Sequence, residues 1–127
     1  MHRFTFNPES PIPQTTTLML DKGDKVSFWN SLNVTYKQPN SIAFYITIEA
    51  QNTPPAEIFC DALNPTLTFA SVTIEKGNYV DKSWKISRMN CEYGPTTQQQ
   101  TVTITATPKV DSIETTKFHK LILELRR

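Results

Sequence analysis

The residues of this chain best suited to covalent chemistry are its two cysteines. Cys60 and Cys91 lie far apart, so they form neither a C-x-x-C redox pair nor a zinc half-site. Each ends a segment that resembles a β-strand, and a disulfide between them would stabilise the fold by roughly 3 to 4 kcal/mol in the loop-entropy model. The alternative is two buried free thiols. We favour the disulfide, which would imply an extracytoplasmic protein because cytosolic thiols are kept reduced.

Side chains suited to acid–base or metal chemistry are few and scattered. His2 and His119 are the two histidines, and neither has a partner at the spacing of metal ligands. Three glycines in the whole chain leave no phosphate-binding loop, and no serine lies in a nucleophile-elbow pattern. Asp21 and Asp24 flank a turn where calcium could bind, although aspartate is also a common turn former. We therefore expect no enzyme activity, no metal site and no cofactor.

Two aromatic residues are the candidates for ligand binding. Trp29 and Tyr45 occupy odd positions in segments whose apolar residues occupy even positions, so both rings could lie on the outer face of a sheet. Exposed rings on a sheet can stack on sugar rings or anchor a protein partner. A β-bulge or a covering loop would instead place them in the core. We take Trp29 and Tyr45 as candidate ligand-binding residues for a protein or a glycan.

The elements that must position these residues are short strands. The clearest spans residues 41–50, where the apolar side chains share one face: Ile42, Phe44, Ile46 and Ile48. Similar alternation recurs along the chain between turns rich in Pro, Gly and Asn, which is typical of a sandwich or barrel. We predict an all-β fold, a single antiparallel β-sandwich over residues 1–127, of jelly-roll or immunoglobulin-like type, with about eight strands.

The same alternation predicts the core and some irregularities. The expected core residues are Leu18, Leu20, Val26, Phe28, Ile42, Phe44, Ile46, Ile48, Trp84, Ile86, Val102, Ile104, Leu121 and Leu123. A bulge is expected near Asn30, and a kink or sheet crossing between residues 67–69 and 72–74, where the apolar parity changes. Residues 118–127 fit a strand or a helix. We favour a strand that pairs with residues 101–107 as a closing hairpin.

Composition excludes several classes of protein. A chain of 127 residues suits one domain, and 38% hydrophobic with 20% charged residues is typical of a folded protein. A net charge of +1 without a basic cluster gives no electrostatic footprint for nucleic acid. No apolar run approaches the roughly 20 residues that span a membrane. We expect no nucleic-acid partner and no membrane span.

Residues 20–29, LDKGDKVSFW, resemble the turn-to-strand segments of small exported bacterial β-sandwich domains of uncharacterised function. The resemblance carries no catalytic residue, and it implies an exported protein. The sequence does not open on a signal peptide. For an exported protein, we therefore expect that the signal peptide is not included in the sequence given. The expected location is extracytoplasmic (periplasmic, cell surface or secreted), with the cytoplasm as the alternative.

Two functions follow from these observations. The first is a non-enzymatic extracytoplasmic module that binds a protein or a glycan. The alternative is a structural or assembly subunit that self-associates or pairs through edge strands. Residues 41–50 motivate the alternative, because a long strand with few charges invites pairing when it lies at an edge.

Overall fold

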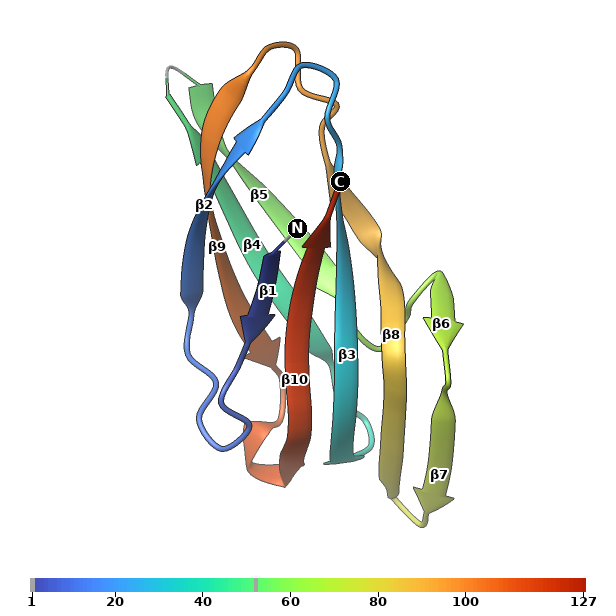
Figure 1. The fold of residues 1–127 in the computed structure, drawn as a ribbon. Coiled ribbons are helices and arrows are strands. Elements are labelled where there is room, and N and C mark those ends of the chain that lie inside the picture. Colours follow the sequence, from blue (N-terminus) through green and yellow to red (C-terminus); the bar gives the residue numbers. More distant parts are fainter. Residues whose placement is uncertain (1, 52) are drawn as a thin grey trace.

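The computed structural model describes residues 2–51 and 53–127, which form ten strands and one short helical turn (Figure 1). The elements in chain order are β1 (His2–Thr5), β2 (Gln14–Leu20), β3 (Val26–Lys37), β4 (Ile42–Ala50), β5 (Thr53–Asp61), β6 (Leu67–Phe69), β7 (Val72–Lys76), β8 (Tyr79–Tyr93), β9 (Gln100–Val110), the 3-10 turn η1 (Ile113–Thr115) and β10 (Thr116–Arg126). The strands are separated by turns and loops, as the sequence pattern predicts.

The strands form two antiparallel sheets that pack as a sandwich. The larger sheet has the order β1-β10-β3-β8, with β6 and β7 both paired to the far side of β8. The smaller sheet has the order β2-β9-β4-β5. This confirms the all-β sandwich, with ten strands where about eight were expected. Strands β6 and β7, where a single kinked strand or a sheet crossing was expected, are short and lie at one edge of the larger sheet (Figure 1).

The core lies between the sheets and contains most of the residues that alternation predicts. Its largest fully buried side chains are Phe4, Phe6, Phe28, Phe44, Leu20, Leu32, Ile42, Ile46, Ile48, Met89, Ile104 and Leu121. Leu18 is only partly buried. Each buried strand residue removes apolar surface from water, worth roughly 25 cal/mol per Å². The core therefore holds the outward-facing residues of both sheets in fixed positions.

The prediction of Ile86 as a core residue is wrong. Residues 30–32 of β3 lie opposite residues 84–87 of β8, three residues against four, so β8 contains an extra residue here. This bulge shifts the alternation of β8, and Ile86 lies opposite Phe69 of β6 on the outer side. An irregularity was expected at Asn30, but the additional residue belongs to the partner strand. Asn30 itself is buried and accepts a hydrogen bond from Trp84 Nε1.

Two further predictions concern strand neighbours. Residues 118–126 belong to strand β10, as favoured, but β10 pairs with β1 and β3, while β9 pairs with β2 and β4. The predicted closing hairpin is therefore wrong, because the chain crosses from one sheet to the other between β9 and β10. Residues 41–50 are not an edge either, since β4 is enclosed by β9 and β5. The kink between residues 69 and 72 is present at Ala70, whose φ is 55°.

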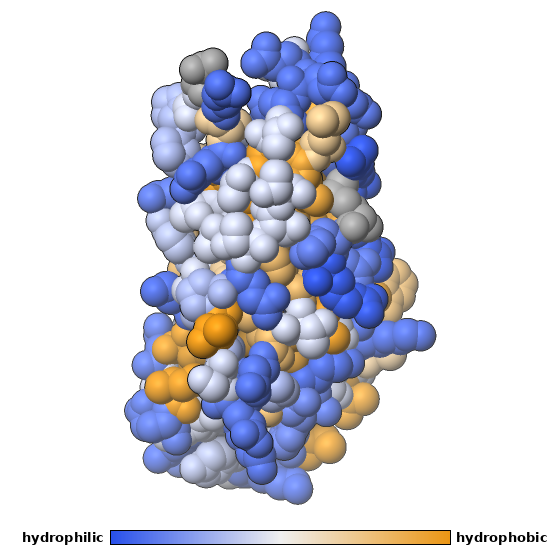
Figure 2. Space-filling view, turned by 60° about the vertical axis from the view of Figure 1, so that its left-hand side comes forward, coloured by the Kyte–Doolittle hydropathy of each residue, from blue (hydrophilic) through white to orange (hydrophobic). Residues whose placement is uncertain are grey.

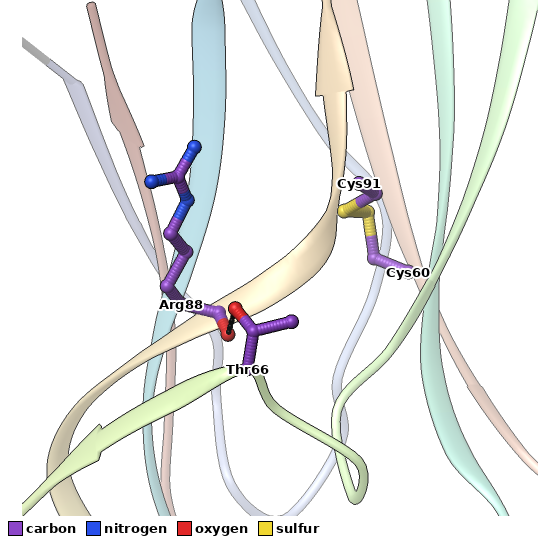
Figure 3. The surroundings of a disulfide bond; sticks show 4 residues. All are labelled: Cys60, Thr66, Arg88 and Cys91. Carbon is purple, nitrogen blue, oxygen red and sulfur yellow. Dashed lines mark hydrogen bonds between the residues drawn. A yellow bond between two sulfur atoms is a disulfide. The ribbon is translucent and has the colours of Figure 1, made fainter.

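A disulfide joins the two sheets. Cys60 of β5 bonds to Cys91 of β8, with the Cα atoms 5.6 Å apart (Figure 3). Close by, the backbone N–H of Thr66 donates to the carbonyl of Arg88 at 2.9 Å, and its hydroxyl donates to the same oxygen at 3.2 Å (Figure 3). These contacts fix the point at which the chain leaves the smaller sheet and enters β6.

Candidate functional site

Trp29 lies on the outer face of the larger sheet. Its cross-strand neighbours are Arg88 and Glu124, and its indole N–H donates to the hydroxyl of Ser27 at 2.9 Å. The guanidinium carbon of Arg126 lies 4.6 Å from the ring centroid, and that of Arg88 lies 6.0 Å away. Both distances suit cation–π attraction. The two cationic side chains thus cover the half-buried ring, and their attraction to it stabilises the surface of the sheet.

Glu124 organises the charges around Trp29. Its carboxylate accepts hydrogen bonds from Arg126 Nε at 2.7 Å and from the Arg3 guanidinium at 3.1 Å. Burial acts to raise the pKa of Glu124, but the hydrogen bonds and charges of Arg126 and Arg3 outweigh it and hold that pKa below its ordinary value. This arrangement is an ion-pair network rather than a site open to a ligand.

Tyr45 lies on the outer face of the smaller sheet, so it cannot share one site with Trp29. It is directly opposite Phe59 of β5 on one side and Thr107 of β9 on the other. Hydrogen bonding to Glu57, aided by desolvation and the charge of that carboxylate, raises the pKa of Tyr45. The phenol therefore keeps its proton at neutral pH and donates it towards Glu57, while its oxygen can still accept a hydrogen bond.

Phe59 is the residue that sequence reasoning missed. Its side chain is 61% exposed, although phenylalanine is normally buried. The next residue, Cys60, is fully buried in the disulfide, so alternation along β5 directs Phe59 outward. Side chains directly opposite in an antiparallel pair have Cβ atoms about 5 Å apart. Phe59 and Tyr45 are thus directly opposite aromatic residues on neighbouring strands, and together with Thr47, Glu57 and Thr107 we call them the aromatic surface.

Threonine hydroxyls extend this face across β9 to β2. Thr15 and Thr105 are hydrogen-bonded at 3.0 Å, and Thr17 and Thr103 at 3.4 Å. Thr105 lies in turn beside Thr47 of β4. Figure 2 shows the molecule with the β2 side turned forward; pale side chains of near-neutral hydropathy fill much of its upper half, and hydrophobic ones lie in small groups. The surface beside the aromatic pair is therefore rich in small hydroxyl groups.

The remaining candidates from the sequence have structural partners. Asp24 accepts a hydrogen bond from the backbone N–H of Asp21 at 2.8 Å and lies 3.6 Å from the Arg127 guanidinium. His119 shares a hydrogen bond with the Thr35 hydroxyl at 3.2 Å. Across residues 2–51 and 53–127, no three His, Cys, Asp or Glu side chains are grouped as metal ligands. Within the same ranges no helix has the length and apolarity needed to cross a membrane.

In a comparison with known proteins, no protein-family model, no curated protein and no solved structure matched this chain.

Proposed function

We propose that the sandwich is of the jelly-roll type. The strand orders β1-β10-β3-β8 and β2-β9-β4-β5 support this, because consecutive strands β1/β2, β3/β4 and β9/β10 divide between the sheets. Strands β6 and β7 are then an insertion beside β8. Jelly rolls occur in lectin and capsid domains, among others. That likeness is one of architecture alone, and the function has to come from a site.

We propose that the protein is a non-enzymatic module that binds a neutral glycan on the aromatic surface of the smaller sheet. The single observation that carries the proposal is Phe59, a 61% exposed ring directly opposite Tyr45 on a face that no other part of the described chain covers. An aromatic ring combines a large apolar face with, in tyrosine, a polar end. Such rings match the C–H faces of sugars, which are apolar although their rims are polar.

Hydrogen-bonding groups around the ring pair favour a glycan over a protein. Thr47 can donate and accept, the Tyr45 oxygen can accept, and Glu57 accepts only, so sugar hydroxyls find both kinds of partner. The central part of a protein interface is poorer in charged groups and richer in aromatic residues, Met and Arg than this face. Because Glu49 and Glu57 project on this side, an acidic glycan would be repelled, which points to a neutral one.

An extracytoplasmic location belongs to the same proposal. The Cys60–Cys91 bond supports it, since disulfides persist in oxidising compartments and are rare in the cytosol. Glycans of cell walls, capsules and cell surfaces are also found there. The disulfide would keep β5, which presents Phe59, in place against β8.

The test is electrophoresis through native gels that contain β-glucan, xylan or mannan. We expect at least one polysaccharide to retard the wild-type protein, and Phe59→Ala to weaken that binding about tenfold, equivalent to about 1.4 kcal/mol. Phe69→Ala is the matched control, because Phe69 is 50% exposed on the larger sheet and should leave binding unchanged. Equal mobility of all three proteins in every gel, or an equal loss in both variants, would refute the proposal.

A further inference from the structure

A polar hollow lies at one end of the smaller sheet, where β2 ends and β9 begins (Figure 1). Its volume is about 490 Å³, which is within the range of pockets that hold small ligands. Leu20 and Val102 are fully buried, so alternation directs Met19 and Thr101 to the outer face, the same face as the aromatic surface. The hollow is lined by Met19, Gln51, Gln98, Gln99, Gln100 and Thr101.

Glutamine amides determine the chemistry of this hollow. Each amide has an oxygen that accepts hydrogen bonds and an NH₂ group that donates two, so one amide can bind two neighbouring hydroxyls of a sugar ring. The amide nitrogen of Gln99 donates to Asp21 Oδ1 at 3.3 Å and to Met19 Sδ at 3.6 Å, which holds its side chain at the wall. Met19 is 58% exposed and adds an apolar group. All six lining side chains that the structure describes are uncharged, so the hollow suits a neutral ligand rich in hydroxyls.

A row of threonines on β9 joins the hollow to the aromatic surface. Every second residue from Thr101 to Thr107 is a threonine that faces outward, because the residues between them are fully buried. Thr107 lies opposite Tyr45, so six residues of strand separate the aromatic surface from the hollow, a distance of about 20 Å. Thr15 and Thr17 of β2 are hydrogen-bonded to this row and widen it. Short, stiff side chains thus form a shallow floor lined with hydroxyls.

We infer that the ligand is a linear glycan chain of several sugar units that lies along β9, with one part on the aromatic surface and another in the hollow. This inference rests on the proposed glycan binding and defines the form of the ligand. A single sugar could contact only one of the two places, because they are about 20 Å apart. A chain that reaches both gains affinity, since its second contact is made within the complex already formed.

Isothermal titration calorimetry with chains of two lengths tests this inference. The probes are the hexasaccharides of β-glucan, xylan and mannan, each compared with the disaccharide of the same polysaccharide. For the glycan that retards the protein in native gels, we expect the hexasaccharide to bind at least about tenfold more tightly, because it adds hydrogen bonds in the hollow. Equal affinity of the two lengths would overturn the inference and leave glycan binding itself in place.

A double variant, Gln98→Ala with Gln99→Ala, tests the contribution of the hollow. It should remove most of the tenfold gain of the hexasaccharide and leave disaccharide binding unchanged. A long chain also gains affinity by offering several registers to one short site, but that gain would survive the double variant. Asn90→Ala is the matched control, because it removes an exposed amide from β8 of the other sheet and should change neither affinity.

The outcomes separate this inference from the proposal on which it rests. Phe59→Ala should weaken the binding of both lengths, because both contact the aromatic surface. A double variant that binds the hexasaccharide as the wild type does, or that loses affinity equally for both lengths, would overturn the inference alone. Wild-type protein that binds neither length of any of the three glycans would refute the proposed function and this inference together.

Discussion

Tyr45 and Phe59 are exposed because the residues beside them are held in the core. Phe44 and Cys60 are fully buried, and side chains along a strand alternate between its faces. The outward position of Tyr45 follows from the regular pattern of residues 41–50. That of Phe59 does not, because Ile58 and Phe59 are adjacent apolar residues and either parity is acceptable. The bond from Cys60 to Cys91 fixes Cys60 in the core. Because side chains alternate along β5, Ile58 then points inward and Phe59 points outward.

Trp29 illustrates a different limit at the residue scale. Alternation indicates an outward ring, and the structure places it on the outer face of its sheet. The residues that cover the ring, Arg88 and Arg126, come from strands far away in the sequence. The local sequence does not show which side chains will cover a ring of this kind, so the accessibility of Trp29 could not be predicted.

Glu124→Gln should reduce the pH dependence of stability below about pH 5. The pKa of Glu124 is lowered by folding, so the carboxylate contributes stability above its unfolded pKa of about 4.3, and this is lost as pH falls through the lower folded value. We expect the variant to lose about 0.5 to 1 kcal/mol at pH 7 and much less at pH 2. Urea unfolding at both pH values measures this. Glu92→Gln is the control, since the ion-pair contacts of Glu92 are 3.8 Å or longer, and an equal effect there would contradict the assignment.

Strand boundaries and the inward faces of long strands are predictable at the scale of elements, since each depends on local alternation and turn residues. Ile86 shows where this stops. Ile86 and Trp84 have the same parity, so alternation predicts that both face the core. The extra residue in β8 that changes this is evident only from the register between β8 and β3. The insertion of β6 and β7 beside β8 likewise depends on pairing between strands, which alternation alone does not specify.

A glycine contact joins two loops at one end of the sandwich. The backbone N–H of Thr96 donates to the carbonyl of Asp24 at 3.0 Å, and that of Gly23 donates to the carbonyl of Thr96 at 2.8 Å. Gly94 has φ of 103°, and a Cβ there would lie 2.5 Å from the Asp24 carbonyl oxygen. The close approach of the two loops therefore requires glycine at position 94.

Gly94→Ala should be more destabilising than Gly23→Ala, measured as the free energy of unfolding in urea. Both positions have positive φ, which costs alanine about 1 to 2 kcal/mol, but a Cβ at Gly23 would meet no atom within 4 Å. The clash at Gly94 should add about 1 to 3 kcal/mol. Equal losses in the two variants would show that the loops do not approach as described.

At the scale of the whole molecule, fold class and core were predictable but strand order was not. Alternation says which side chains point inward, and it leaves open which strands are neighbours. The crossing between β9 and β10 is decided by packing across the sandwich. The Cys60–Cys91 pairing was favoured from the sequence because each residue ends a strand, and the structure joins them across the two sheets.

Replacing both cysteines by alanine should lower the free energy of unfolding by about 3 to 4 kcal/mol, because the unfolded chain is released from a closed loop. Urea denaturation measures the loss, and reduced wild-type protein should be destabilised to a similar extent. Alkylation of the denatured, non-reduced wild type should modify neither cysteine. Two modified thiols in protein prepared without reductant would remove the main support for an extracytoplasmic location.

The central claim is that a neutral glycan binds the smaller sheet beside Phe59 and Tyr45, and an NMR titration tests it most directly. The probe is the hexasaccharide of whichever polysaccharide retards the protein in native gels, added to ¹⁵N-labelled protein. The account predicts that the largest shift changes fall on β4 and β5, around Tyr45, Thr47 and Phe59. Changes centred on Trp29 and β3, or no saturable change at all, would contradict it.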